Sequence, residues 1–242
     1  MLSDDAKAFT KENLDNYLKE LSREFRKLNG NKMPAEIILV GGASILINYG
    51  FRDATYDCDA IVHASSAMKE AANNVGDRLG LPNGWFNSDF QRTKSYSDKL
   101  SQYSKHYRTF FNIVDIRTVS GEYLVAMKLM SGRQYKNDMS DIVGILWEQQ
   151  QNGQPLSFQD IDRAVCNLYD GWKALPDEAR KQIEEILTGN DLENLYNYYL
   201  DSEIKTKQNL VEFEEKYPKV LTEKNLEQII QQLEREIESK KQ

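Results

Sequence analysis

Cysteine and histidine are both scarce in this chain of 242 residues. Cys58 and Cys166 are the only cysteines, too few for the disulfide framework of a small secreted protein. We therefore expect a reduced, cytoplasmic protein. His63 and His106 are the only histidines, and their separation matches no metal-binding spacing. We expect both to be structural or surface residues.

Long apolar runs are also missing. No hydrophobic stretch approaches the roughly 20 residues that a membrane-spanning helix needs. Residues 1–30 predict a charged helix rather than a signal peptide. The apolar and charged fractions, 40% and 29%, are typical of a soluble globular protein. We therefore expect no membrane partner.

A surplus of basic charge is the third absence. The formal net charge is −7, whereas general binding of DNA requires an excess of lysine and arginine facing phosphates. A local exception lies in residues 92–108, where basic side chains alternate with tyrosines. Its members are Arg92, Lys94, Tyr96, Lys99, Tyr103, Lys105, His106, Tyr107 and Arg108. This basic stretch could bind a polynucleotide, but a solvated loop accounts for it more simply.

Hydrophobic periodicity predicts an α/β (α+β) fold in which helices surround a small mixed sheet. The run Ile37–Val40 predicts a buried strand, and residues 56–62 predict a second strand. A third region of strand, in one or two pieces, is expected within residues 109–119. Helices are expected at 7–28, 43–49, 67–79 with Ser66 as its cap, 122–131 and 138–149.

The composition changes near residues 149–153, and helical patterns dominate beyond that point. Ser157 and Asp160 have the spacing of a capping box, and Asp191 can cap a further helix. A last helix is expected over residues 221–240. We therefore expect a core domain with an N-terminal helix over residues 1–150 and a helical C-terminal region over residues 151–242.

The most informative local pattern is a strand, the pair Gly41-Gly42, a short helix, and then Asp57-Cys58-Asp59 on a second strand. Glycines after a strand allow backbone amides to approach a phosphate, and the next helix adds its positive N-terminal end. Ser44 adds a hydroxyl donor. Two aspartates at positions i and i+2 of a strand point the same way and can bind hard cations.

A tight turn next to a solvent-exposed pair of aspartates, without any function, would show the same sequence pattern. A lone Gly-Gly or a lone Asp-x-Asp is weak evidence. The order of the elements and the apolar residues on both sides favour a functional site, because carboxylates beside buried strands need a reason to be there.

At this point the sequence resembles the polymerase-β-type nucleotidyltransferases, and more closely their DUF6036 and AbiEii-like (type IV toxin-like) branch. Three motifs in order carry the resemblance. They are Gly41-Gly42-x-Ser44 with Arg52 and Thr55-x-Asp57-x-Asp59, then Leu81-Pro82-Asn83-Gly84-Trp85-Phe86-Asn87, then Lys128-Leu129 with Arg133, Asp138 and Asp141. The resemblance spans about residues 36–148.

The resemblance implies roles for individual residues. Gly41, Gly42 and Ser44 would hold the phosphates of a nucleoside triphosphate (NTP), although Gly-Gly-Ala-Ser departs from the adjacent Gly-Ser of the superfamily. Asp57 and Asp59 would bind Mg²⁺ or Mn²⁺, with Asp115 as the candidate third acid. Lys128 would reach a phosphate, and Asp141 would orient it or act as a base. Arg52 and Thr55 would brace the loop that presents the aspartates.

The function that follows is metal-dependent transfer of a nucleoside monophosphate from an NTP to a hydroxyl of RNA or protein. The branch resemblance implies the toxin of a bacterial toxin–antitoxin or phage-defence pair, with a cognate antitoxin as partner. Two alternatives stay open. One is transfer to a small molecule, and the other is a degenerate fold that binds a nucleotide or a partner without catalysis.

Overall fold

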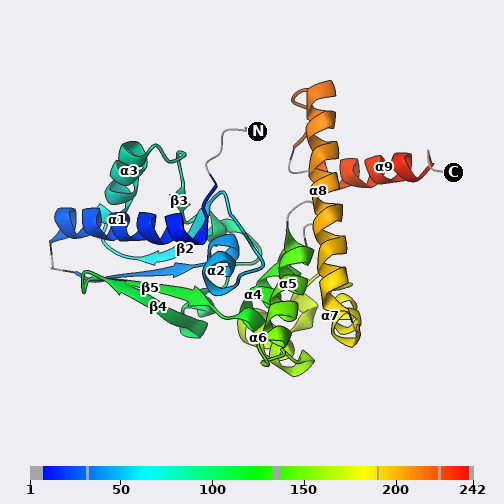
Figure 1. Cartoon of the computed structure of the whole chain (residues 1–242), viewed down its shortest axis with the longest axis horizontal. Coiled ribbons are helices and arrows are strands. Elements are labelled where there is room, and N and C mark those ends of the chain that lie inside the picture. The colour runs from blue at the N-terminus through cyan, green and yellow to red at the C-terminus, as the bar shows by residue number, and fades with distance from the viewer. Residues whose placement is uncertain (1–7, 31–32, 133–136, 190, 223–224, 240–242) are drawn as a thin grey trace.

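The computed structural model describes residues 8–30, 33–132, 137–189, 191–222 and 225–239 (Figure 1). Its centre is a five-stranded sheet in the order β3-β2-β1-β5-β4. The strands are β1 (Ala35–Leu39), β2 (Cys58–His63), β3 (Phe86–Asn87), β4 (Ser104–Phe110) and β5 (Val114–Val119). Strand β1 runs parallel to β5 and antiparallel to β2, so the sheet is mixed. The predicted α+β class is confirmed.

One face of the sheet is covered by α1 (Lys11–Asn29) and α3 (Ala67–Leu79), as Figure 1 shows. Alternate residues of β1, Ile37 and Leu39, point toward these helices and share a hydrophobic cluster with Leu21 of α1. Because Ile38 and Val40 are buried on the opposite face, β1 is covered on both sides, which explains why it contains almost no polar residues.

Residues Ile38 and Val40 belong to a second hydrophobic cluster, which most of the later helices complete. These helices are α2 (Gly41–Asn48), α4 (Gly121–Ser131), α5 (Asp138–Gln151), α6 (Phe158–Tyr169) and α7 (Ala179–Thr188). Short 3₁₀ turns lie at Asp89–Arg92, Asp98–Tyr103 and Trp172–Ala174. Because α6 and α7 share a core with α4, the expected division near residue 150 stays a prediction.

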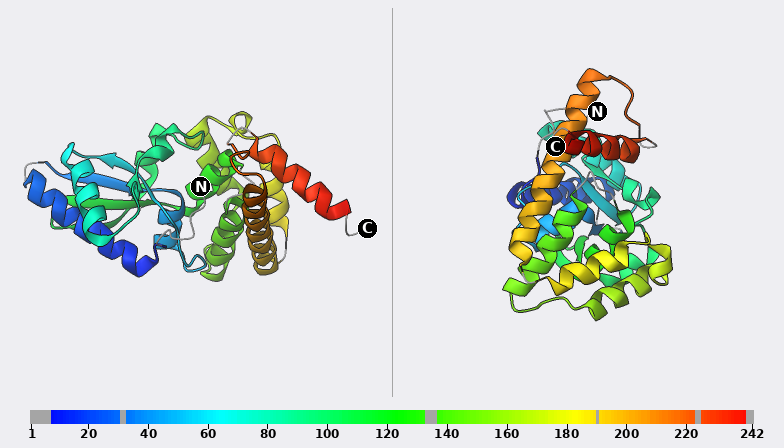
Figure 2. Two further views of the ribbon diagram at one scale, coloured as in Figure 1. Left: turned by 90° about the horizontal axis from the view of Figure 1, so that it is seen from above. Right: turned by 90° about the vertical axis from the view of Figure 1, so that its right-hand side faces the viewer.

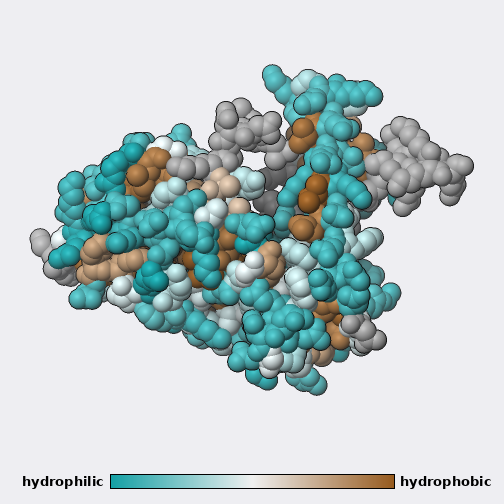
Figure 3. Space-filling model, in the orientation of Figure 1, coloured by the Kyte–Doolittle hydropathy of each residue, from teal (hydrophilic) through white to brown (hydrophobic). Residues whose placement is uncertain are grey.

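Helix α8 (Leu192–Lys216) packs along α5 and then extends beyond it, where α9 (Leu226–Ser239) lies against its far end (Figures 1 and 2). Leu210, Ile229 and Ile230 form the small apolar contact between the two helices. The outward side of α8 also carries exposed apolar residues, including Ile204 and Val211, and Figure 3 shows brown patches along this helix.

Most predicted elements are found, with several differences. Strand β3 was not predicted, and β2 begins at Cys58 rather than at residue 56, so Asp57 precedes the strand. Strand β4 begins at Ser104, inside the stretch interpreted as a loop, because a bulge between His106 and Arg108 disrupts the alternation. Ser66 makes no capping hydrogen bond, since its own backbone is already helical. The last helix begins at Leu226 rather than at residue 221. In the described residues, no helix combines the length and apolar character that crossing a membrane requires.

Candidate active site

The Gly41-Gly42 turn joins the end of β1 to α2, and each glycine has its own reason. Gly41 adopts φ +54°, a left-handed conformation that side chains other than glycine rarely adopt. Position 42 requires glycine for lack of space, because a Cβ there would lie 2.5 Å from Thr55 Oγ1 and 3.1 Å from Arg52 Nη2. The turn is therefore packed directly against Thr55 and Arg52.

The two aspartates of the Asp-x-Asp motif lie beside this turn. The backbone N–H of Val40 donates to the carbonyl of Asp59 at 3.0 Å, so Asp59 of β2 is level with the residue before Gly41. Asp57 immediately precedes β2 and is exposed, whereas Asp59 is half-buried. Thr55 Oγ1, which contacts Gly42, also donates to Asp57 Oδ1 at 3.4 Å. The order of motifs in the sequence thus corresponds to proximity in space.

Cys58, between the two aspartates, points to the opposite face and is completely buried. Burial raises the pKa of its thiol, and the neighbouring Asp59 and Asp57 raise it further. Cys58 is therefore a packing residue rather than a nucleophile.

Residues 50–57, which we call the presenting loop, lead from α2 to the aspartates and are held by hydrogen bonds. The N–H groups of Gly50 and Phe51 donate to Glu148 Oε2 of α5 at 2.8 and 3.1 Å. Thr55 forms an isolated β-bridge with Phe9 near the N-terminus, in both directions. The loop is thus fixed by two parts of the chain that are distant in sequence.

A buried ion cluster fixes the middle of the presenting loop. Arg52 Nη1 contacts both carboxylate oxygens of Asp141, at 2.5 and 2.6 Å. Lys128 Nζ of α4 lies 2.7 Å from Asp141 Oδ2 and 2.7 Å from Asp138 Oδ1. Burial by itself would lower the pKa of Lys128, but Asp141 and Asp138 outweigh it and raise that pKa. Lysine 128 is therefore charged and salt-bridged on two sides.

The structure thus assembles Arg52, Thr55, Asp57, Lys128 and Asp141 beside Gly42, although they span almost 90 residues of sequence. The position of Asp141 also restricts its role. Both of its oxygens are bound by cations and its side chain is 3% exposed, so it positions Arg52 and Lys128 and is not placed to act as a base.

The expectation for Ser44 needs correction. Its side chain is completely buried, and Oγ accepts the N–H of Val119 at 2.9 Å and donates to the Val119 carbonyl at 3.4 Å. Asn48 Nδ2 donates to the same carbonyl at 2.8 Å. Ser44 therefore anchors α2 to the end of β5, and its hydroxyl is not presented to a phosphate.

The expected third acid, Asp115, is not brought to the aspartate pair. It pairs with Glu36 on β1, whereas Asp59 lies level with Val40, four positions further along. At about 3.3 Å per residue this is a separation of about 13 Å along the strand. Its carboxylate instead contacts His106 Nδ1 at 2.6 Å and Arg117 Nη1 at 3.4 Å. Within the described ranges, no three His, Cys, Asp or Glu side chains are grouped to hold a metal.

The tyrosines of the basic stretch make contacts within the protein. Tyr103 stacks on Tyr123 with centroids 4.5 Å apart, and Tyr96 contacts Phe90 edge-on at 6.0 Å. Tyr107 donates its hydroxyl to Asp15 at 3.1 Å. Lys99 pairs with Asp170 and Arg108 with Asp15, each at 2.7 Å. These contacts favour a structural role for the tyrosines over a platform for stacking bases.

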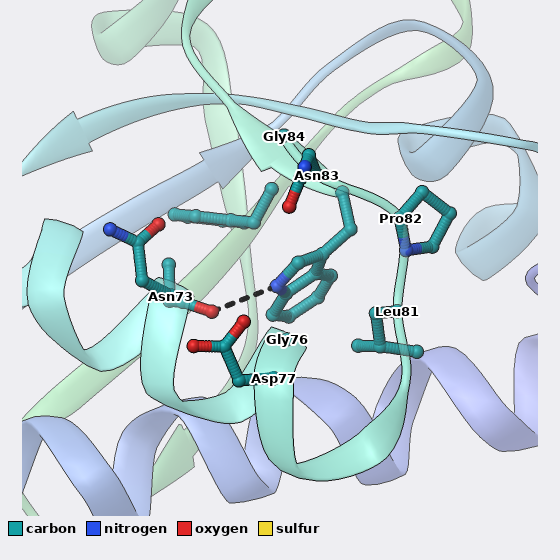
Figure 4. A pocket seen from close by; sticks show the side chains of 10 residues that line it. Asn73, Gly76, Asp77, Leu81, Pro82, Asn83 and Gly84 are labelled. Carbon is teal, nitrogen blue, oxygen red and sulfur yellow. Dashed lines mark hydrogen bonds between the residues drawn. The ribbon is translucent and has the colours of Figure 1, made fainter.

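The motif at residues 81–87 forms a pocket of about 300 Å³ with α3 (Figure 4). The Trp85 indole N–H donates to the Ala72 carbonyl at 3.0 Å, the dashed line in Figure 4, and Gly76 provides the space for the ring. The Trp85 carbonyl accepts the N–H of Cys58 at 2.9 Å. This motif therefore supports the strand that carries Asp59. Arg133, part of the third motif, lies outside the described residues.

Sequence reasoning assigned no role to several residues that the structure adds to the site. Asp138 is the second acid on Lys128, and Glu203 of α8 accepts hydrogen bonds from the first turn of α5. Asn87 pairs with Asp59 across β2 and β3. No local pattern distinguishes Glu203 from the other acids of α8.

The mixed sheet, the Gly-Gly turn and the adjacent Asp-x-Asp motif at the start of β2 are the features on which the resemblance to nucleotidyltransferases rests. The model of the family DUF6036, described as a nucleotidyltransferase of unknown function, matches residues 16–151. This is more than half of the chain, and the protein belongs to this nucleotidyltransferase family. Comparison with curated proteins and with solved structures gives no significant match.

Proposed function

We propose that the protein transfers a nucleoside monophosphate from an NTP to a hydroxyl acceptor on RNA or protein and depends on Mg²⁺ or Mn²⁺. The observation that carries this proposal is the contact chain from Gly42 through Thr55 to Asp57. It joins a turn suited to phosphate with carboxylates suited to a divalent cation. Family membership supports the general class of reaction.

The donor set fits magnesium. Mg²⁺ in proteins is usually held by one or two carboxylates together with substrate phosphates and water. Asp57 and Asp59 provide two carboxylates, one exposed and one half-buried, next to the turn. A third protein carboxylate is therefore not required. When bound, the ion would neutralise phosphate charge and acidify the attacking hydroxyl.

The protein's own residues would bind and orient the triphosphate. The Gly41-Gly42 turn begins α2, so free backbone N–H groups and the positive end of the helix are available for phosphate oxygens. In the transfer, the acceptor oxygen bonds to the α-phosphorus, the bond to pyrophosphate breaks, and the hydroxyl proton is lost to water. Arg52 and Lys128 are neutralised by Asp138 and Asp141, so their part would be to hold the presenting loop in place rather than to supply net positive charge to the phosphates.

The direct test is incubation with labelled NTPs, Mg²⁺ and total cell lysate, followed by separate digestion with ribonuclease and protease. Label that ribonuclease or protease removes supports a macromolecular acceptor and identifies its class. Label in a small molecule after both digestions would instead favour the small-molecule alternative. The toxin role rests on the branch resemblance alone, and growth arrest on expression, dependent on Asp57, would test it.

An NTP together with Mg²⁺ should raise the melting temperature of the protein, because a ligand that binds only the native state stabilises that state. The expected gain is about 2.7 kcal/mol at a hundredfold excess over the dissociation constant. Differential scanning fluorimetry with NTP, with Mg²⁺ and with both measures it. No shift at millimolar NTP with Mg²⁺ would contradict nucleotide binding.

Gly42→Ala should lower transfer more than Gly41→Ala does. The new Cβ at position 42 would press on Thr55 Oγ1, which holds Asp57, whereas a Cβ at position 41 meets nothing within 4 Å. Gly41→Ala should lower stability by about 1–2 kcal/mol, because alanine is strained in the left-handed backbone conformation. Initial rates at a temperature where both variants are folded provide the comparison. Equal rates would mean that Thr55 does not transmit the displacement.

A further inference from the structure

Helix α8 lies beyond the family match, which ends at residue 151, yet one of its faces contacts the candidate site. Tyr196, Glu203 and Lys207 are spaced at i, i+7 and i+11, so they lie on the same side of the helix. All three make hydrogen bonds to α5, its N-cap or the presenting loop.

Glu203 binds the first turn of α5. Its Oε1 accepts the N–H groups of Met139 and Ser140 at 3.1 and 3.2 Å, and its Oε2 accepts the Ser140 hydroxyl at 2.5 Å. A carboxylate at this position satisfies helix N–H groups that have no partner within the helix and interacts favourably with the helix dipole. The side chain is 4% exposed, so this is a buried cap supplied by another helix.

The same turn of α5 carries the acids of the ion cluster. Asp138 and Asp141 flank Met139 and Ser140, and they hold Lys128 and Arg52. Lys207, one turn beyond Glu203, donates to the side chain of Asn137, which is the N-cap of α5. Movement of this turn would therefore move Arg52, and with it the presenting loop.

Tyr196 contacts the presenting loop directly. Its hydroxyl donates to the Phe51 carbonyl at 3.0 Å, and its ring stacks on Trp147 of α5 and meets Phe51 edge-on. Helix α8 thus holds the loop at Phe51 and, through α5, at Arg52. These contacts combine hydrogen bonds with ring packing, whereas the contact that joins α8 to α9 is apolar.

We infer that α8 is part of the active site and that Glu203 is a positioning residue, acting through the first turn of α5 on the loop that presents Asp57. This inference rests on the proposed transfer reaction for its catalytic consequence. Its structural part, the control of loop 50–57 by α8, is independent of the reaction. The nucleotidyltransferase core would then be incomplete without the C-terminal helices.

The test compares Glu203→Ala, Glu203→Gln and the control Glu212→Ala, an exposed glutamate on the same helix. Hydrogen exchange of the Gly50 and Phe51 amides reports on the loop without requiring any activity. Steady-state kinetics with NTP and Mg²⁺, well below the melting temperature, separate kcat from KM. Tyr196→Phe, which removes only the hydroxyl, repeats the exchange test in case Glu203→Ala does not fold.

We expect Glu203→Ala to speed exchange in the loop and to lower kcat on the order of 10–100-fold with KM for NTP little changed, because reacting groups would be misplaced rather than binding lost. Glu203→Gln keeps an acceptor oxygen and should restore much of kcat, whereas a role in stability alone would leave kcat of the folded protein intact. Unchanged loop exchange in both Glu203→Ala and Tyr196→Phe would overturn the inference. So would normal kcat in a folded Glu203→Ala variant. Absence of transfer by the parent protein would defeat the proposed function, while loop exchange would still decide whether α8 controls the loop.

Discussion

Asp57→Asn and Asp59→Asn should each abolish nucleotidyl transfer and leave the protein folded. Both aspartates lie next to the Gly41-Gly42 turn, Asp59 through its backbone and Asp57 through Thr55, and asparagine removes the charge at almost constant volume. Loss of metal-derived stabilisation worth several kcal/mol corresponds to a rate decrease on the order of a thousandfold or more. Initial rates of labelled NMP incorporation measure the effect.

Stability should not fall in either variant. Two like charges held close together repel each other, so removing one is neutral or slightly stabilising. Asp177→Asn, an exposed aspartate before α7, is the matched control and should retain full activity. If all three variants turned over at the rate of the parent, the Asp57 and Asp59 site would have no part in the reaction. If the parent bound NTP with Mg²⁺ but transferred nothing, the non-catalytic binding module would be the better description.

The sequence anticipated that the Gly41-Gly42 turn and the aspartates are neighbours, because that arrangement depends on short stretches of chain. Strand alternation places Asp59 opposite the buried Cys58, and the apolar run before Gly41 marks the strand that carries the turn. The structure adds that β2 runs antiparallel to β1, which returns the chain directly to the Gly41-Gly42 turn.

The predictions for Asp115 and Ser44 failed because they depend on strand register and on burial. Asp115 lies on a strand adjacent to β1, as expected for a third acid, but a register that aligns it with Glu36 moves it away from Asp59. The register of two strands is determined by the whole sheet and not by the local sequence around Asp115. The predicted phosphate contact of Ser44 failed for a similar reason, since the short helix α2 directs the Ser44 hydroxyl toward β5.

Glu203 could not be predicted because its partner is the start of a helix more than 60 residues earlier in the chain. Its spacing from Tyr196 and Lys207 is that of any helix face. Only the crossing of α8 over α5 brings the three residues to the presenting loop. The family match likewise stops before this helix, so neither motif nor family would have identified it.

Lys128→Met should cause the largest loss of stability of any single substitution in the candidate site. Lys128 is 12% exposed and lies 2.7 Å from each of two nearly buried carboxylates, so methionine removes a positive charge that contacts both acids, of which Asp141 still keeps Arg52. Breaking a buried ion pair by removing one partner costs about 3–5 kcal/mol, because the opposite charge has already lost its water. For a protein of this length, a loss of that size lowers the melting temperature by about 6–20 °C.

Thermal and urea denaturation of Lys128→Met measure this loss against Lys181→Met, which breaks an exposed pair. Lys181 lies 3.7 Å from Glu185 with both side chains about two-thirds exposed or more, and such a pair contributes only about 0–1 kcal/mol. Asp141 keeps Arg52 in Lys128→Met, whereas Asp138 loses its contact with Lys128. Adding Asp138→Asn removes that carboxylate charge, so the double variant should be more stable than Lys128→Met alone. A Lys128→Met variant no less stable than Lys181→Met would mean that water reaches the cluster and that its charges do not hold the presenting loop. A double variant less stable than Lys128→Met would place the stabilising contacts of Asp138 elsewhere than on Lys128.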